Sequence, residues 1–290
     1  MVQHRCWMLF GILMMFSALR LENCTGADPE AGSPFDRSNL VAWCIVPFDA
    51  EKRGPAARAE MVSQLGLSRV AYDWRAEHVP TFEDEIEQYK KHGIEFFAFW
   101  SWHDSFEPLI KKHGIRPQIW LMLPTPEGED DEARVAAAVK WLEPMVEKTR
   151  QLGLKLGLYN HGGWQGEPEN LVAICKKLRA DDRASHVGII YNFHHGHDHV
   201  ERFPQALALM KPYLFCLNIN GMADPVTVEG NRNKILPLGD GIHEREMLQE
   251  VIQQGYEGPI GILDHRNDTD SKEALSANLQ GLDQIVAGLK

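Results

Sequence analysis

Short apolar runs alternate along this chain with longer amphipathic segments, and several of these segments end in glycine. After Gly66, Gly93, Gly114 and Gly153 the next residue is apolar and begins a new run. Glycine just past a helix supplies the left-handed residue that ends it, so each amphipathic segment is expected to be a helix that leads into a strand. Apolar runs without alternation indicate strands buried on both faces, as in a parallel sheet covered by helices. They predict strands at residues 40–47, 69–74, 94–100, 117–123, 154–160, 187–192, 213–219 and 259–264.

Apolar spacing also predicts the helices. One is expected over residues 131–152, and the last helix carries leucines and a valine three or four residues apart from Leu275 to Leu289. Such a stripe is typical of a face that packs into the core. Thr81–Asp84 predicts a capping box at the start of another helix, and Asp270 is expected to cap the last one.

Eight strands that alternate with helices predict an α/β fold, a single-domain (β/α)8 TIM barrel. The alternative is a doubly wound open sheet, but no glycine-rich dinucleotide loop follows the first strand. In a barrel the active site lies at the carboxyl ends of the strands, so the residues at strand ends become the candidates for function.

The N-terminal residues have the pattern of a secretory signal peptide. Arg5 precedes a 14-residue apolar run, Cys6–Leu19, which is too short for a membrane-spanning helix and is followed by the small residues of Thr25–Ala27. A lipoprotein anchor at Cys24 is the alternative, but the residues before it fit poorly. We therefore expect a signal peptide at 1–27, an N-terminal tail at 28–38, a barrel at 39–290 and export to the periplasm or the extracellular space.

Charge and cysteine usage narrow the class of partner. Removal of residues 1–27 takes away two arginines and one glutamate, so the net charge goes from −11 to −12. An acidic surface disfavours nucleic acid, and no integral membrane segment is expected after signal cleavage. The remaining Cys44, Cys175 and Cys216 have no paired spacing, and Cys44 and Cys216 lie in apolar runs that predict core positions. The oligomeric state is left open.

The richest strand end follows the run 187–190. Four of the 13 histidines, His194, His195, His197 and His199, fall within six positions there. Imidazole titrates nearest neutrality and is the commonest metal ligand, so the stretch predicts proton transfer or metal binding. A solvated loop that happens to be rich in histidine is the alternative.

Aromatic and planar polar side chains gather at the other strand ends. Aromatic faces pack on the C–H face of a sugar ring, and amides, carboxylates and guanidinium groups bind its hydroxyls, so the sequence predicts a carbohydrate as the small-molecule partner. The predicted substrate-binding residues are Trp43, Asp73, Arg75, His78, Trp102, Tyr159, Asn160, Trp164, Asn192, Asn218 and Asn220. For Trp100 and Trp120 ordinary packing is favoured or equally expected, and Arg75 has an ion pair with a neighbouring carboxylate as its alternative.

The predicted catalytic residues are His161, His194, His195, Asp264 and His265. The pair Asp264–His265 suits a base and the group that orients it, although a cap on the final helix is the alternative for the carboxylate.

These strand ends resemble the xylose-isomerase-like barrels, the sugar phosphate isomerase/epimerase superfamily. The resemblance covers about residues 39–289 and rests on Leu158–Gly163, the histidine-rich stretch, Leu217–Gly221, Leu238–Ile242 and Gly258–Asp264. It implies the barrel fold and a divalent metal held by Glu, Asp, His and Glu on strands five to eight, where the metal polarises a carbonyl.

The matching positions here are Tyr159, Asn192, Asn218 and Asp264, so only Asp264 keeps an anionic ligand. Two outcomes remain open. Either the ligand set has moved, with Asp264, His161, His195 (or His194) and His197 holding a transition metal such as Mn, Zn or Co, or the pocket works without metal.

Three functions are weighed. The first is an exported isomerase, epimerase or keto-sugar lyase or hydratase that abstracts a proton next to a carbonyl. The second is a non-catalytic sugar-binding barrel derived from such enzymes. The third, an abasic-site endonuclease type of phosphodiesterase, is disfavoured by the missing carboxylates and the acidic charge.

Overall fold

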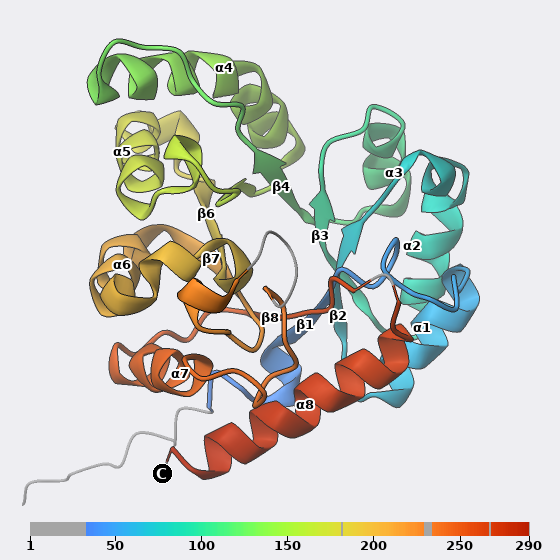
Figure 1. Cartoon of the computed structure of the whole chain (residues 1–290). Helices are drawn as coiled ribbons and strands as arrows, with labels where there is room; N and C mark the ends of the chain where they lie inside the picture. Colours follow the sequence, from blue (N-terminus) through green and yellow to red (C-terminus); the bar gives the residue numbers. More distant parts are fainter. Residues whose placement is uncertain (1–32, 181, 229–233, 267, 290) are drawn as a thin grey trace, which may run out of the picture. The chain divides into compact units, whose positions relative to one another are not determined.

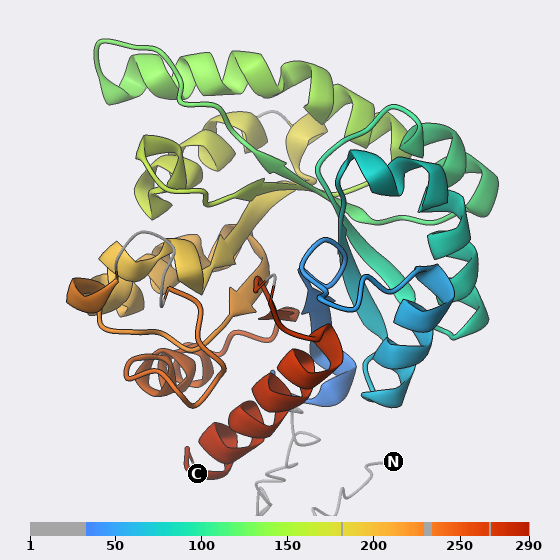
Figure 2. The ribbon, with the colours of Figure 1, turned by 45° about the vertical axis from the view of Figure 1, so that its right-hand side comes forward.

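The computed structural model describes residues 33–180, 182–228, 234–266 and 268–289. Within them eight parallel strands close into a barrel in which each strand pairs with the next and β8 pairs with β1. Figure 1 and Figure 2 show the helices arranged around the strands. The closed barrel confirms the predicted fold class and rejects the open sheet. The strands are β1 (Leu40–Trp43), β2 (Arg69–Asp73), β3 (Glu95–Trp100), β4 (Gln118–Met122), β5 (Leu156–Tyr159), β6 (Val187–Asn192), β7 (Leu214–Ile219) and β8 (Ile260–Leu263).

Each predicted strand contains one of these, because the runs are buried on both faces in the way that continuous apolar sequence requires. The main helices are α1 (Pro55–Gln64), α2 (Phe82–Lys91), α3 (Phe106–His113), α4 (Asp131–Leu152), α5 (Pro168–Arg179), α6 (Phe203–Met210), α7 (Glu244–Gln253) and α8 (Ser271–Ala287). None of the helices in the described ranges has both the length and the apolar character of a membrane span.

Helix ends follow the predicted signals with one exception. Gly114 and Gly153 adopt left-handed φ angles of 62° and 66° after α3 and α4, and the Asp270 side chain accepts from the backbone of Lys272 at the start of α8. The capping box at Thr81 is wrong. This residue ends a 3-10 turn, and its hydroxyl donates to the carbonyl of His78 (2.9 Å) instead of to α2.

The predicted signal peptide lies outside the described residues, as does the first part of the predicted tail. From Ser33 onward the chain packs on the barrel: Phe35 is buried in the core, and the Arg37 guanidinium pairs with the Asp283 carboxylate (2.6 Å).

Candidate active site

Two adjoining cavities lie at the carboxyl ends of the strands. The inner chamber, of about 160 Å³, is lined by the last residues of β1, β2, β3 and β5 and by the loops after β1, β2, β5, β6 and β8. The outer chamber, of about 750 Å³, adds Lys234–Pro237, Arg266 and Asp268. The two share the lining residues Phe48, His161, His194, His195 and His265. Because strand ends surround the inner chamber, it occupies the place where barrel enzymes hold their substrates.

The inner chamber has three kinds of lining. Its aromatic part is formed by Trp43, Phe48, Trp100 and Tyr159. Its imidazole part is formed by the four histidines named above. Its remaining part is formed by Cys44, Asp73 and Arg75, at the ends of β1 and β2. Aromatic rings, imidazoles, the guanidinium group of Arg75 and the carboxyl group of Asp73 therefore surround a cavity about the size of a small ring.

The four histidines lie against one another. Ring centroids are 3.7 Å apart for His194 and His195, 4.5 Å for His161 and His195, and 5.7 Å for His194 and His265. Burial, followed by the charge that neighbouring imidazoles would carry, lowers the pKa of His195 to about 3 and puts the pKa of His194 well below its usual value. Burial also lowers the pKa of His265 to about 4. The imidazoles are therefore neutral at pH 7 and offer hydrogen bonds rather than charge.

This neutrality predicts how stability depends on pH. The unfolded chain binds a proton at His195 below about pH 6.5 and the folded chain only near pH 3, so the free energy of unfolding falls as the pH is lowered through this interval. The raised pKa values of Asp73 and Asp264 act in the opposite sense between about pH 4 and 7, so the comparison must be made between variant and wild type. When the pH is lowered from 7 to 5, the free energy of unfolding of His195→Gln, measured by urea denaturation, should fall less than that of wild type. The expected difference between the two decreases is up to about 2 kcal/mol. Identical pH dependence would show that His195 is not held neutral.

Not every predicted residue reaches the chambers. Trp102 donates its indole N–H to Asp104 (2.9 Å) in the loop after β3, and Trp164 donates to Asp131 (2.7 Å) at the start of α4. His78 Nδ1 accepts from the backbone of Arg75 (2.9 Å) and so supports the loop. These three side chains line neither chamber.

Three of the four predicted asparagines form a buried ladder of hydrogen bonds. Asn160 Oδ1 accepts from the side chain of Asn192 (2.9 Å), and Asn192 Oδ1 accepts from Asn218 (2.7 Å). The Asn218 amide oxygen in turn accepts from the thiol of Cys216 (3.5 Å), and Asn220 donates to the carbonyl of Gly221 (2.9 Å). All four asparagines are fully buried and line neither chamber, and the bonds among Asn160, Asn192 and Asn218 join the ends of β5, β6 and β7.

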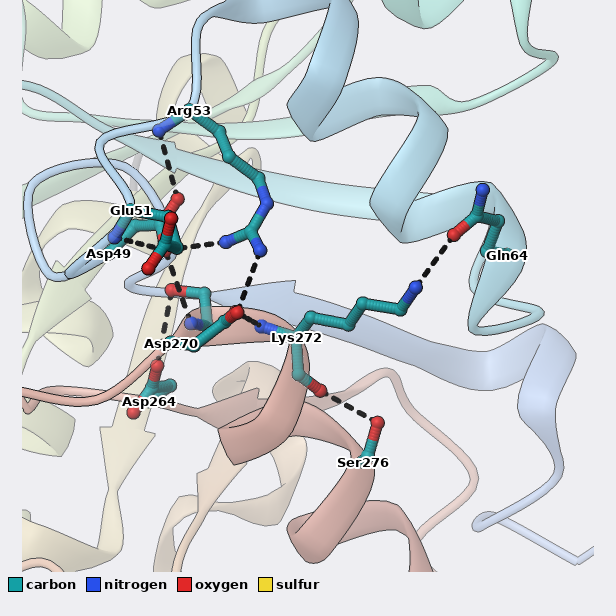
Figure 3. Close-up of polar contacts among 9 residues, drawn as sticks. Asp49, Glu51, Arg53, Gln64, Asp264, Asp270, Lys272 and Ser276 are labelled. Carbon is teal, nitrogen blue, oxygen red and sulfur yellow. Dashed lines mark hydrogen bonds and ion pairs between the residues drawn. The ribbon is translucent and has the colours of Figure 1, made fainter.

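Asp264, His197 and His199 line neither chamber. The Asp264 carboxylate contacts the hydroxyl of Ser271 (3.3 Å) and Nε of Arg266 (3.4 Å), next to the polar network at the start of α8 in Figure 3. His197 contacts the carbonyl of His194 (3.2 Å), and His199 Nδ1 lies 3.0 Å from the Tyr191 hydroxyl. The alternative interpretation of Asp264, a group that secures the start of the last helix, matches this placement.

The donor set does not fit the family's metal. The amide oxygens of Asn192 and Asn218 already accept hydrogen bonds, and the Arg266 cation contacts Asp264. Burial raises the pKa of the Tyr159 hydroxyl well above its usual value, so this position presents a neutral phenol. Nor do Asp264, His161, His195 and His197 converge. In the described part of the chain, three ligand atoms within 4.8 Å of one another occur only at Glu83, Glu87 and His113, on the outer helices α2 and α3.

Three lining residues of the inner chamber are not among those that the sequence predicts. Cys44 was predicted as core, which its 5% exposure confirms, but it also faces the inner chamber. The sequence does not single out Phe48, and for Trp100 it makes packing favoured or equally expected. The available signal was position, because Trp100 is the last residue of β3 and Cys44 and Phe48 follow the end of β1.

Comparison with known proteins agrees with this architecture. The family model of the xylose isomerase-like TIM barrel matches residues 75–285, so the chain belongs to this family. No curated protein sequence matches it. All the similarities to solved structures quoted below are under 25% identical and show a shared fold.

Three solved structures illustrate the fold. The IOLI protein with a binding zinc atom aligns at TM-score 0.66 and 15% identity, over 87% of this chain and 99% of its own. The probable 3-DHS dehydratase AsbF of Bacillus anthracis aligns at 0.60 and 15%, over 84% and 98%. The 3-keto-D-glucoside 4-epimerase YcjR of E. coli aligns at 0.57 and 14%, over 86% and 99%.

Proposed function

We propose that the protein is an exported carbohydrate-active enzyme of the isomerase or epimerase type, which acts on a sugar or keto-sugar by abstracting a proton next to a carbonyl group. Keto-sugar lyase or hydratase chemistry begins with the same step and is included. The family supports a sugar-modifying role, and the solved structures of similar fold include a 4-epimerase and a probable dehydratase.

The inner chamber carries the proposal. A cavity of about 150 Å³ holds one benzene molecule, so a chamber of about 160 Å³ has room for one six-membered ring. Four of its lining residues have buried polar atoms without a protein hydrogen bond of ordinary geometry: Nε1 of Trp43 and Trp100, Nδ1 of His194 and both carboxylate oxygens of Asp73. Buried polar groups are normally hydrogen-bonded, and the hydroxyls of a sugar would supply the missing partners.

The outer chamber bears on substrate size. Its volume of about 750 Å³ leaves space for a second unit once a ring fills the inner chamber. Two cationic side chains, Lys234 and Arg266, line it together with the carboxylate of Asp268, and the sequence does not predict this arrangement. The substrates worth testing therefore include glycosides and sugar acids besides free sugars.

Deuterium wash-in tests the reaction class. Purified protein is incubated in heavy water with keto- and aldo-sugars, free, as glycosides and as acids, and the carbon next to the carbonyl is followed by NMR. We expect enzyme-dependent incorporation at that carbon for at least one substrate. If no substrate of the panel incorporates deuterium, the proposed enzymatic activity is rejected.

A non-catalytic sugar-binding barrel is the second candidate, and the unsuitable metal positions are the observation that favours it. It predicts saturable glycan binding, visible in the fluorescence of Trp43 and Trp100, with no deuterium incorporation. Binding and wash-in measured on the same panel separate the two candidates.

A further inference from the structure

In the absence of the family's ligand set, two other groups of this chain have the chemistry to polarise a carbonyl and to take a proton. Asp73 is the last residue of β2, and Arg75 follows in extended conformation at φ −127° and ψ 172°. Residues two apart in an extended chain point to the same side, and both line the inner chamber. Trp74 between them points away and donates to the carbonyl of Ser101 (2.8 Å).

The Arg75 guanidinium is held in place by its surroundings. Its central carbon lies 5.3 Å from the ring centroid of Phe48 and 5.6 Å from that of Trp100, and Nη1 donates to the carbonyl of Trp74 (2.8 Å). A guanidinium has five N–H donors in a rigid plane, so a fixed head group of this kind presents oriented donors to an oxygen in the chamber.

Asp73 is unusual among the buried carboxyls. It is 1% exposed, and no hydrogen bond of ordinary geometry reaches either of its carboxylate oxygens, although the Cys44 thiol and the backbone of Val46 lie close enough to act on its pKa. The buried carboxylates of Asp49 and Asp264, by contrast, accept hydrogen bonds at the start of α8, as Figure 3 shows. Burying an unpartnered carboxyl opposes folding, which points to a ligand as its missing partner.

We propose that Asp73 and Arg75 form a metal-independent enolising pair, in which Asp73 is the catalytic base and Arg75 binds the carbonyl oxygen of a sugar. The inference rests on the proposed function and names the groups that perform it. Both residues would contact the substrate.

The step balances without a further reactant. The C–H bond next to the carbonyl breaks, and its proton bonds to a carboxylate oxygen of Asp73. The C–H electron pair becomes the C=C bond of an enolate while the carbonyl π pair moves onto oxygen, where the guanidinium N–H groups stabilise the charge. Return of the proton to carbon reverses the step, and in heavy water the returned proton is a deuteron.

The protonation equilibria support this division of roles. Burial raises the pKa of Asp73 to about 7, although the positive charges of Arg75 and Arg58 oppose the rise. A base whose pKa lies near the working pH transfers protons efficiently, whereas His195 and His265 are far weaker bases. Burial and the adjacent Asp73 also raise the pKa of the Cys44 thiol well above its usual value, which keeps it protonated.

Asp73→Asn tests the pair because it keeps the shape and removes the base. With a substrate that wild type exchanges, we expect the variant to lose exchange by about 10²- to 10⁴-fold while sugar binding, followed by tryptophan fluorescence, persists. The matched control is Asp104→Asn, an exposed change after β3 that lines neither chamber, and it should exchange at the wild-type rate.

The outcomes are distinguishable. Exchange by Asp73→Asn within threefold of wild type would overturn the pair and leave the proposed function standing, whereas no exchange by wild type on the whole panel would overturn both. A second measurement covers failure of the variant to fold: wild-type exchange should rise about tenfold from pH 6 to pH 8, as a base with pKa near 7 loses its proton. A flat profile there would contradict the assignment.

Discussion

Replacing Arg75 by methionine is expected to lower the deuterium exchange rate constant by about 10²- to 10³-fold, the usual cost of removing one donor from a developing oxyanion. Methionine keeps much of the apolar contact with Phe48 and Trp100 and deletes the charge and the N–H donors. The measurement is the rate of deuterium incorporation at saturating substrate, which separates this effect from a change in affinity.

Two further variants give this experiment its controls. Arg75→Lys keeps the charge without the planar donors, so it should recover only part of the rate. Arg266→Met removes a cation that lines the outer chamber only, and it should alter affinity for larger substrates more than the rate on a single ring. Arg75→Met with wild-type exchange would refute a role in polarising the carbonyl.

The second large effect concerns stability. Arg58 of α1 and Glu85 of α2 form a 2.6 Å ion pair in which the side chains are 3% and 0% exposed. Removing one partner leaves an uncompensated buried charge, so Arg58→Met should reduce the free energy of unfolding by about 3–5 kcal/mol in urea denaturation.

The matched control is Arg37→Met, which breaks the ion pair between Arg37 and Asp283. The side chains of these two residues are 38% and 64% exposed, respectively. Exposed pairs contribute about 0–1 kcal/mol, so this variant should be nearly neutral. The double variant Arg58→Met with Glu85→Leu removes both buried charges and should regain most of the loss. If the double variant is as unstable as the single one, lost packing rather than an orphaned charge explains the effect.

The fold could be predicted from the sequence because a parallel barrel leaves a strong local signal. Runs such as Val187–Asn192 are buried on both faces, and glycines such as Gly114 and Gly153 end helices in left-handed conformation. Because the active site of a barrel lies at the carboxyl ends of its strands, the sequence also pointed to residues that line the inner chamber. These are Trp43, Asp73, Arg75, Tyr159, His161, His194, His195 and His265.

The rest of the site depends on information that is not local. Whether Trp100 or Trp102 faces the chamber depends on where β3 ends: Trp100 is the last residue of the strand and lines the chamber, whereas Trp102 lies beyond it, where the alternation of a strand no longer sets the direction of a side chain. The asparagine ladder depends on register, since Asn192 lies opposite Asn218 across β6 and β7. Sequence spacing gave no sign that these amides would satisfy one another rather than a substrate.

In this family barrel, two of the four positions that match the metal ligands, Asn192 and Asn218, belong to an internal hydrogen-bonded ladder, and proton transfer is proposed at the end of β2 instead. The histidines form a neutral wall of the same pocket and do not gather with Asp264 into a ligand set.

The most direct test measures metal content and wash-in on the same purified sample, before and after exhaustive chelation. We predict no stoichiometric divalent metal and an exchange rate that chelation leaves unchanged. About one equivalent of metal per chain, with exchange abolished by chelation and restored by Mn, Zn or Co, would contradict the account.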